Sequence, residues 1–355
     1  MLLGVPGGVI ELHTGEFRRQ RRAEPGVPIE FVDYITMRTA RRPDKSGCPR
    51  WLKFLRDALL EQQEVIDFLQ QYLGYCLTGL TAEQKMLFIH GPGGSGKGTF
   101  VHTVTNIMGD YAIDAPSEVF MASKTDRHPQ EIARLRGARV VASTEVEEGR
   151  DWNEARIKLW TGGDKLTGHL MKQNDETFQP NFKLIVSGNH QPSLKSPDRA
   201  IKRRLLMVPF MLEVADKDVD LKLEKKLEAE WPGILAWMIE GCLAWQKQGR
   251  LIVPKSIVED TAEYLKGEDT VGRWFTERCE QTKDTAQVEE KGGGCFHNYE
   301  AWAKREGITN IKGSRDFAAA LGAIKGVKKL PHTRKGNFFK GFQLKSIEFS
   351  EVLEG

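Results

Sequence analysis

The 355-residue chain is 40% hydrophobic and 28% charged, a composition typical of globular domains, and its formal net charge of +3 is too small to indicate a nucleic-acid partner by itself. Its length predicts two or three domains. Its five cysteines are scattered and form no C-x-x-C pair. This pattern argues against a zinc site or a disulfide framework and fits a reducing compartment. No apolar run approaches the roughly 20 residues of a membrane span and the N-terminus lacks a signal-peptide layout, so the sequence argues against a membrane protein and predicts an intracellular one.

Residues 1–84 are predicted to form an arm followed by a small helical segment. Residues 1–28 are rich in glycine, proline and arginine and contain short apolar alternations, which predicts a hairpin or an arm. They carry the basic cluster Arg18, Arg19, Arg21 and Arg22. This cluster either contacts nucleic acid or is a solvated charge run. Residues 33–49 are expected to be irregular, and the helical apolar spacing from Arg50 to Tyr75 predicts two amphipathic helices.

The stretch FIHGPGGSGKGTF, residues 88–100, predicts a phosphate-binding loop. An apolar run enters a glycine-rich turn, and helical spacing follows over residues 100–108. In such a loop the backbone N–H groups converge on phosphate oxygens, the helix adds its positive end, and the lysine reaches the β- and γ-phosphates. The predicted nucleotide-binding residues are Gly91, Pro92, Gly93, Gly94, Ser95, Gly96, Lys97, Gly98 and Thr99.

One position of this motif departs from the usual pattern. The residue after Lys97 is ordinarily Ser or Thr, whose hydroxyl binds Mg²⁺, but here it is Gly98. Thr99 follows one position later and is our candidate for the Mg²⁺ or phosphate contact. Which residue ligates the metal therefore stays open.

Strand and helix signals alternate after this loop, which predicts an α/β fold with a parallel sheet. The apolar run over residues 138–144 ends in several glutamates, of which Glu145 is our first and Glu147 our second candidate for handling Mg²⁺ and water. The next strand, residues 182–187, is followed by Asn189. Asn189 either contacts the γ-phosphate or the attacking water, or is a turn residue.

Two basic segments flank this second strand. Residues 161–180 predict a β-hairpin that carries Lys165, His169 and Lys172, which either contact DNA phosphates or are solvated. Four cations, Arg199, Lys202, Arg203 and Arg204, precede the apolar strand over residues 205–210. An arginine here either reaches the nucleotide of a neighbouring subunit or belongs to a surface patch.

The remainder of the chain predicts helices and a C-terminal module. Residues 216–247 are helical, and we place a domain boundary near residues 251–254. The module is expected to contain a helix over 263–280, a break at Gly292–Gly294, helices over 296–305 and 315–321, and strands near 328–331 and 338–344. This is a winged-helix layout whose basic residues are Lys325, Lys328, Lys329, Arg334, Lys335 and Lys340. It either contacts the DNA backbone or docks a protein.

Taken in order, these pieces resemble the phage and plasmid primase-helicases related to poxvirus replication helicases, in superfamily III of the AAA+ ATPases. The resemblance rests on GPGGSGKGTF, VVASTEVEEG, RIKLWTGGDKLTG, FKLIVSGNHQP and DRAIKRRLLMVPF, which follow one another as in that family. It implies an arm and helical segment over residues 1–84, an AAA+ P-loop ATPase domain over 85–250 and a winged-helix-like domain over 251–355.

The resemblance also implies roles for single residues. Lys97 would be the Walker A lysine, Glu145 the Walker B carboxylate and Asn189 the sensor asparagine. Arg204, with Arg203 beside it, would be the arginine finger that acts on the neighbouring subunit. The hairpin with His169 and Lys172 would be the DNA-translocating hairpin of a central channel. The implied cofactors are ATP and Mg²⁺.

The resulting hypothesis is an ATP-dependent DNA helicase that acts in phage, prophage or plasmid replication in the cytoplasm of a bacterial host. Family resemblance implies a hexameric ring that moves 3′ to 5′ on single-stranded or forked DNA. No primase domain is visible, so we expect a helicase-only fragment, a prophage remnant or a protein whose primase is encoded elsewhere. The alternatives are a P-loop nucleotide phosphotransferase, suggested by G-K-G-T, and a DNA-binding replication remnant that does not hydrolyse ATP.

Overall fold

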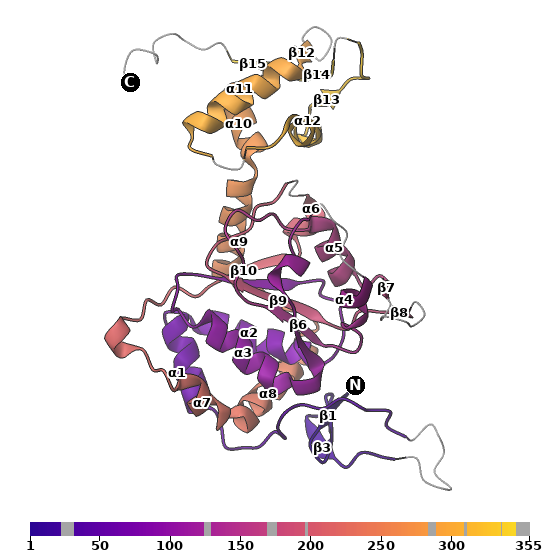
Figure 1. The fold of residues 1–355 in the computed structure, drawn as a ribbon, viewed down its shortest axis with the longest axis vertical. Helices are drawn as coiled ribbons and strands as arrows, with labels where there is room; N and C mark the ends of the chain where they lie inside the picture. Colours follow the sequence, from indigo (N-terminus) through magenta and orange to yellow (C-terminus); the bar gives the residue numbers. More distant parts are fainter. Residues whose placement is uncertain are drawn as a thin grey trace. The chain divides into compact units, whose positions relative to one another are not determined.

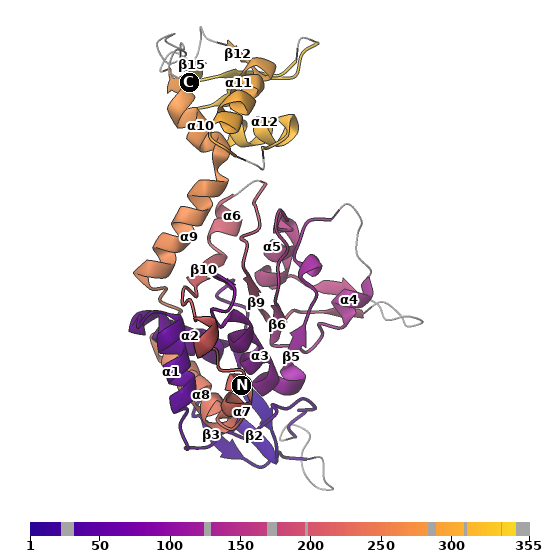
Figure 2. The same cartoon turned by 60° about the vertical axis from the view of Figure 1, so that its left-hand side comes forward.

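The computed structural model describes residues 1–22, 32–123, 129–168, 176–195, 198–282, 289–308, 311–334 and 336–345. The chain divides into two compact units (Figures 1 and 2). The first contains residues 1–192 and 199–262, and the second contains residues 193–198 and 263–355. A helix long and apolar enough to cross a membrane is absent from the described part of the chain.

The N-terminal segment begins with a small antiparallel sheet. Its strands are β1 (Leu2–Val5), β2 (Gly8–Glu11) and β3 (Glu16–Arg18), in the order β1-β2-β3. The predicted hairpin at the N-terminus is therefore confirmed and extended by a third strand. Helices α1 (Pro49–Ala58) and α2 (Gln63–Cys76) follow, and they confirm the two helices predicted from apolar spacing.

A five-stranded parallel sheet forms the centre of the first unit and confirms the predicted α/β fold. In chain order its strands are β4 (Met86–His90), β5 (Ala112–Asp114), β6 (Val140–Ser143), β9 (Lys183–Gly188) and β10 (Leu205–Pro209). In space the order is β10-β4-β9-β6-β5. The inner strands are buried along their length, because helices cover both faces of a parallel sheet.

Helices surround the sheet on both faces, as Figures 1 and 2 show. On one face lie α2, α3 (Lys97–Met108) and α8 (Trp231–Gln248), and α7 (Leu223–Glu228) precedes α8. On the other face lie α4 (Pro129–Ala133) and α5 (Glu154–Gly162). The predicted hairpin over residues 161–180 is confirmed by the antiparallel strands β7 (Leu166–Gly168) and β8 (Glu176–Phe178), and α6 (Arg199–Lys202) precedes β10.

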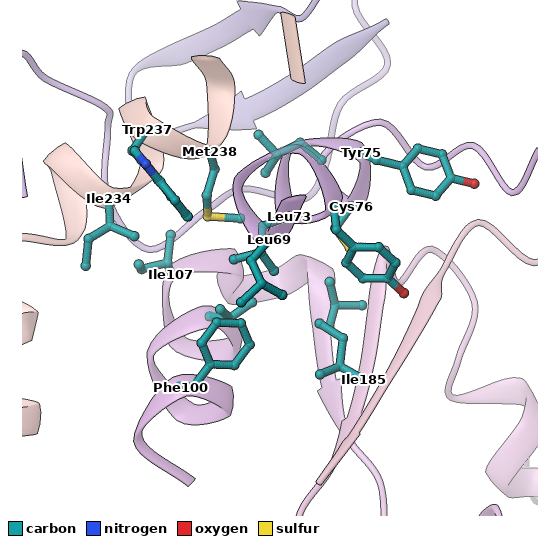
Figure 3. Packing of buried hydrophobic residues seen from close by; sticks show 14 of the residues in the cluster. Leu69, Leu73, Tyr75, Cys76, Phe100, Ile107, Ile185, Ile234, Trp237 and Met238 are labelled. Carbon is teal, nitrogen blue, oxygen red and sulfur yellow. The ribbon is translucent and has the colours of Figure 1, made fainter. Parts of the chain in front are cut away.

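The N-terminal helices share their core with the sheet domain (Figure 3). Leu69 and Leu73 of α2 pack between Met238 of α8 and the residues of α3 and β9, among them Phe100 and Ile185. Helices α2 and α8 cross so closely that a side chain at Gly74 would overlap the backbone of α8. Residues 1–84 are therefore built into the first unit rather than forming a body of their own.

The second unit packs three helices and two small sheets around aromatic residues, with Trp274, Tyr299 and Phe317 at the centre. Its helices are α10 (Thr270–Arg278), α11 (Gly292–Arg305) and α12 (Ser314–Ala323). Its strands are β11 (Cys279–Gln281), β12 (Glu289–Lys291), β13 (Lys328–Lys329), β14 (Phe338–Lys340) and β15 (Phe342–Leu344). Helices followed by a hairpin were predicted and are confirmed, while the identification as a winged helix stays a prediction.

Two predicted features of this region are wrong. The single helix over residues 263–280 is two helices, α9 (Lys255–Glu268) and α10, because Asp269 caps α10 by accepting a hydrogen bond from the N–H of Gly272. The glycine-rich break at Gly292–Gly294 is instead the first turn of α11. The entropic cost of glycine, about 0.5 to 1 kcal/mol relative to alanine, applies to the interior of a helix, and these three glycines lie at its start, directly after β12.

Candidate nucleotide-binding site

The loop between β4 and α3 has the backbone conformation that a phosphate-binding loop needs. Gly91, Gly94 and Gly96 have positive φ angles of 149°, 76° and 92°, a region that favours glycine. A side chain at Gly91 would overlap the carbonyl oxygen of Phe210, and one at Gly96 would overlap the ring of Phe54. Since no side chain caps α3, its first N–H groups keep the capacity to bind an anion.

Lys97 begins α3 and folds back over this loop. Its side chain is 7% exposed, and Nζ donates hydrogen bonds to the carbonyl oxygens of Gly91 (2.9 Å) and Pro92 (2.6 Å) and to Oγ of Ser95 (3.2 Å). Burial lowers the pKa of Lys97. In the described part of the chain, no carboxylate forms an ion pair with this ammonium group. A buried cation with neutral partners alone favours an anionic ligand, and phosphate oxygens supply that charge.

The loop opens into a cleft of about 1480 Å³. Every predicted nucleotide-binding residue from Gly93 to Thr99 lines this cleft, and so do the candidate residues Glu145, Glu147 and Asn189. The structure thus brings together candidate residues as far apart in the sequence as Gly93 and Asn189. A volume of this size is sufficient for a nucleotide.

Two carboxylates follow β6 at the edge of the cleft. Glu145 is exposed, whereas the next residue, Val146, is buried and fixes the turn. Glu145 has a φ of 64°, which is uncommon for a residue with a side chain. Glu147 also faces the cleft and lies 3.7 Å from the guanidinium group of Arg150. Glu148 does not line the cleft, so the three glutamates of this segment are not equivalent.

Asn189 follows β9, and the sheet order explains why it lies near the loop. Strand β9 is inserted between β4 and β6, and all three strands are parallel. Their carboxyl ends therefore meet at one edge of the sheet. Since neighbouring strands are about 4.8 Å apart, Asn189 is one strand and Glu145 two strands from the loop, within about 10 Å of it along the sheet.

Gly98, at the position where the motif usually has the Mg²⁺-binding Ser or Thr, and Thr99, the candidate to replace it, both line the cleft. A side chain added at Gly98 would meet nothing within 4 Å, so the glycine is not required by packing. Thr99 is half-buried on the following position of α3. Among the described residues, no three His, Cys, Asp or Glu side chains are grouped closely enough to hold a metal ion. The residues present fit Mg²⁺ in its usual nucleotide-bound form, with one or two protein oxygens and phosphate oxygens as ligands.

His90, the last residue of β4, was not singled out in the sequence. Its Nδ1 lies 3.2 Å from Nε2 of Gln191, and its buried Nε2 has no hydrogen-bond partner among the described residues. Burial, with a smaller contribution from the charge of Lys97, lowers the pKa of His90 to about 4. The imidazole beneath the loop is therefore neutral at physiological pH.

The two arginines before β10 occupy different environments. The side chain of Arg204 is buried, with Nε donating to Oγ1 of Thr161 (2.8 Å) and a terminal nitrogen donating to the carbonyl oxygen of Ala200 (2.8 Å). Arg203 is exposed and donates to Oε1 of Gln84 (2.9 Å). Because β10 runs parallel to β4, both residues lie at the amino edge of the sheet, opposite the phosphate loop. The guanidinium group of Arg204 is therefore directed into the interior of the chain, whereas Arg203 is exposed at its surface.

Of the three predicted DNA-binding residues of the hairpin over residues 161–180, the structure describes one. Lys165 is exposed directly before β7. His169 and Lys172 lie outside the described residues. Strands β7 and β8, which flank them in the sequence, pair antiparallel.

Part of the cleft was missed in the sequence. Arg50, Lys53 and Phe54 of α1 line it, and so does the segment from residue 218 to residue 224 after β10. Apolar spacing identified Phe54 as a core residue, which it is, but no local signal indicates that α1 also borders the phosphate loop. This part of the site becomes visible only when α1 packs on α3.

Three comparisons with known proteins bear on this site. A family described as a family of unknown function, DUF5906, matches residues 89–204, which contain the loop, both glutamates, Asn189 and the two arginines. Among the curated proteins, one named "Putative helicase" from Acanthamoeba polyphaga mimivirus is 24% identical over 344 residues, which cover 89% of this chain and 34% of that protein.

Two further viral proteins are similar to this chain. A protein of Frog virus 3 named "Putative helicase" is 26% identical over 231 residues, covering 58% of this chain and 23% of that protein. A protein of African swine fever virus named "Putative primase" is 22% identical over 313 residues, covering 81% of this chain and 32% of that protein. The chain thus spans about a third or less of the length of these relatives, which come from large DNA viruses of eukaryotic hosts.

Solved structures support the fold. Two apo structures of the NrS-1 C-terminal region give TM-scores of 0.50 and 0.52 at 12% identity, covering 84% of this chain and 76% of that one. At this identity the likeness concerns the fold. The chain is therefore similar to viral proteins named as helicases and primases, and its mixed α/β architecture is similar to that of the NrS-1 C-terminal region.

Proposed function

We propose that the chain is an ATP-driven DNA helicase of the superfamily III AAA+ type that acts in DNA replication. One observation carries this proposal: the buried Lys97 lies in a glycine-rich loop after β4, and Glu145 after β6 and Asn189 after β9 line the same cleft. In this proposal Asn189, at the end of the strand inserted between the other two, lies beside the phosphates of the bound nucleotide. The names of the viral relatives support a role in replication.

In this proposal the residues of the cleft divide the work of phosphoryl transfer to water. Lys97 and the N–H groups of the loop hold the β- and γ-phosphates and neutralise their charge. Glu145 orients the attacking water, with Glu147 as the second candidate, and Asn189 contacts the γ-phosphate or that water. Thr99 and Glu145 would hold Mg²⁺, which when bound with ATP supplies further positive charge to the phosphates.

The site would be completed by a neighbouring copy of the chain. We assign the arginine finger to Arg203 because its guanidinium group is exposed at the edge of the sheet opposite the loop, about 17 Å away along β10. A head-to-tail ring brings that edge of one subunit to the loop of the next. Arg204 would position this segment through its buried hydrogen bonds. Six subunits and 3′ to 5′ movement remain expectations from the family.

DNA would be moved by the β7–β8 hairpin, on which Lys165 is exposed. The second unit would add a DNA contact through the exposed residues Lys325, Lys328, Lys329 and Arg334 near β13. Phosphate contacts by lysine and arginine position a protein on DNA without reading its sequence. The proposal therefore includes no sequence preference.

One observation favours a second function. Gly98 and Thr99 give the loop the G-K-G-T ending of nucleotide phosphotransferases, and Gly98 has open space beside it. Such an enzyme transfers the phosphate to a second nucleotide instead of water. The two functions differ in their dependence on DNA and in the phosphate acceptor.

The steady-state ATPase rate with and without single-stranded DNA tests the proposal, with Lys97→Ala as the blank. Lys45→Ala is the matched control, because Lys45 is an exposed lysine that does not line the cleft. Hydrolysis that DNA stimulates, and that is lost only in Lys97→Ala, supports a DNA motor. Hydrolysis that is indifferent to DNA, or phosphate transfer to a nucleotide, would refute the motor and favour the phosphotransferase. DNA binding without hydrolysis would identify a replication remnant.

A further inference from the structure

A second hollow lies between the N-terminal sheet and the segment before α1. It has a volume of about 500 Å³ and is lined by the β1–β2 turn, by Arg19 and Arg22 after β3, and by residues 35–38. Its charged groups are the guanidinium groups of Arg19, Arg22 and Arg38 and the carboxylate of Asp110. None of these residues lines the cleft of the phosphate loop.

Hydrogen bonds fix the walls of this hollow. The hydroxyl of Tyr111 accepts a hydrogen bond from the N–H of Gly4 (2.9 Å) and donates one to the carbonyl oxygen of Met37 (2.9 Å), so it ties β1 to the opposite wall. The N–H of Arg38 donates to Oδ2 of Asp110 (3.0 Å), and the N–H of Asp110 donates to the carbonyl oxygen of Arg38 (3.0 Å). The one carboxylate of the hollow is therefore already engaged by the backbone.

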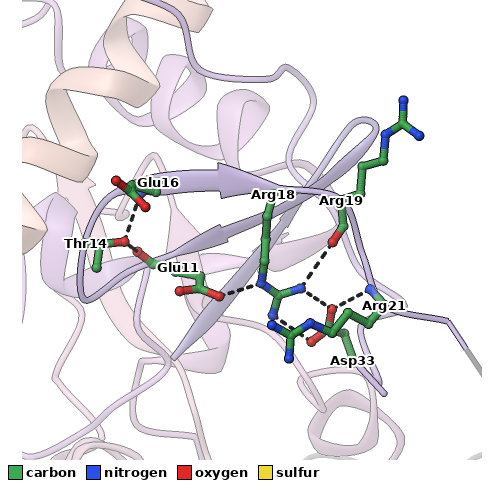
Figure 4. A network of polar contacts seen from close by, with 7 residues as sticks. All are labelled: Glu11, Thr14, Glu16, Arg18, Arg19, Arg21 and Asp33. Carbon is green, nitrogen blue, oxygen red and sulfur yellow. Dashed lines mark hydrogen bonds and ion pairs between the residues drawn. The ribbon is translucent and has the colours of Figure 1, made fainter. Parts of the chain in front are cut away.

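The structure distinguishes the arginines that the sequence presents as one cluster (Figure 4). Arg18 is structural, because its guanidinium group donates to both carboxylate oxygens of Asp33 and also pairs with Glu11. Arg21 donates its backbone N–H to the same aspartate. In Figure 4 the side chain of Arg19 points away from this network.

Three guanidinium groups of the hollow have no such partner. For the side chains of Arg19, Arg22 and Arg38, no hydrogen bond or ion pair to any described residue occurs. All three are exposed. Two other arginines nearby are occupied: Arg41 pairs with Glu228 (3.2 Å) and Arg42 stacks on the ring of Phe17 (3.5 Å). Three uncompensated positive charges therefore line the hollow.

We propose that this hollow, defined by Arg19, Arg22 and Arg38 around the β1–β2 turn, is a second contact site for the phosphate backbone of DNA. Three guanidinium groups around a rigid concave surface are suited to bind successive phosphates, because arginine forms paired hydrogen bonds with phosphate oxygens. The site would hold duplex DNA independently of nucleotide turnover. Only the choice of DNA as the ligand rests on the proposed function.

The test is the salt dependence of DNA binding by the full chain, measured by fluorescence anisotropy with a short labelled duplex of mixed sequence. Each phosphate contact contributes about 0.9 to the slope of log K against log salt concentration. The triple variant Arg19→Gln, Arg22→Gln, Arg38→Gln is expected to have a slope shallower by about 2.7. Between 50 and 200 mM salt, wild type would then lose about 40-fold more affinity than the variant.

The control variant replaces three exposed cations that line neither cavity, Lys45→Gln, Lys247→Gln and Arg250→Gln, and keeps the wild-type slope. Thermal denaturation shows whether both variants are folded, and the ATPase rate without DNA should be unchanged in the triple variant. Equal slopes for wild type and the triple variant would refute this inference while leaving the motor intact. A wild-type chain that binds no DNA would overturn both the inference and the DNA part of the proposed function.

Discussion

Replacing Lys183 by methionine tests how the core beneath the candidate site is held. Lys183 begins β9, the strand that ends beside Asn189, and its side chain is 2% exposed. Nζ donates to the carbonyl oxygens of Leu80 and Asn181 (both 3.3 Å) and lies 4.9 Å from the centre of the Tyr75 ring. Burial lowers the pKa of Lys183 to about 7, from an ordinary value of 10.5.

The sign of the effect follows from proton binding. Between pH 7 and 10.5 the unfolded chain keeps the lysine proton, whereas the folded chain has released it. The unfolded state therefore binds more protons, and the free energy of unfolding rises with pH by up to about 1.4 kcal/mol per pH unit. The full penalty for charging this lysine in the core, about 4 to 5 kcal/mol, is present below pH 7 and disappears as the pH approaches 10.5.

Methionine has a similar length and no charge, so K183M removes this titration. It also leaves the two carbonyl oxygens without the lysine donor, so the change in stability at a single pH mixes both effects. The pH dependence of the free energy of unfolding separates the titration of the lysine from the loss of its hydrogen bonds. In urea denaturation followed by circular dichroism, wild type should gain about 2 to 3 kcal/mol between pH 7 and about pH 9 that K183M does not gain. The exposed Lys45→Met is the control, and equal pH dependence in wild type and K183M would show the reasoning to be wrong.

The other predictions concern the site. Gly98→Ser should keep the free energy of unfolding within about 0.5 kcal/mol of the wild-type value, because a side chain there meets open space. It should also lower the Mg²⁺ concentration needed for ATP hydrolysis. An unchanged Mg²⁺ titration of the ATPase rate would contradict this prediction. Arg204→Ala should destabilise the fold by about 3 kcal/mol, because its buried hydrogen bonds are lost. Arg203→Ala should leave the melting temperature unchanged and lower the ATPase rate about 10³-fold. The opposite pattern would assign the arginine finger to Arg204. Glu145→Gln should lower kcat by about 10² to 10⁴ with nucleotide affinity kept, measured by a fluorescent ATP analogue, and full activity would shift the role to Glu147.

The glycine-rich loop between β4 and α3 was predictable because its sequence signals are local. Glycine spacing, Lys97 and the flanking strand and helix lie within about twenty residues, and each constrains the others. The position of Asn189 beside the loop was predictable in outline, since parallel strands present their carboxyl ends at one edge. The position of β9 between β4 and β6 could not be predicted, because strand order depends on crossovers that no short motif encodes.

The two adjacent arginines show what sequence leaves undecided. Neighbouring side chains at the end of a helix point in different directions, so one step along the chain separates a buried from an exposed guanidinium group. Arg204 is directed toward Thr161, which is distant in sequence, while Arg203 remains at the surface. The same limit applies to Arg18 and Arg19, whose difference depends on Asp33. In both pairs a partner far along the chain decides which arginine is available.

Glu145 connects the backbone to the proposed chemistry. Four residues with side chains have positive φ in the described part of the chain: Leu60, Glu61, Gln84 and Glu145. Only Glu145 lines the cleft. A left-handed residue costs about 1 to 3 kcal/mol and persists where the surrounding structure imposes it. Here the buried Val146, which packs against Gly188 of β9, directly follows Glu145 and fixes the chain at this turn. The strained turn therefore lies at the cleft that Asn189 also lines, where the proposal has Glu145 orient the attacking water.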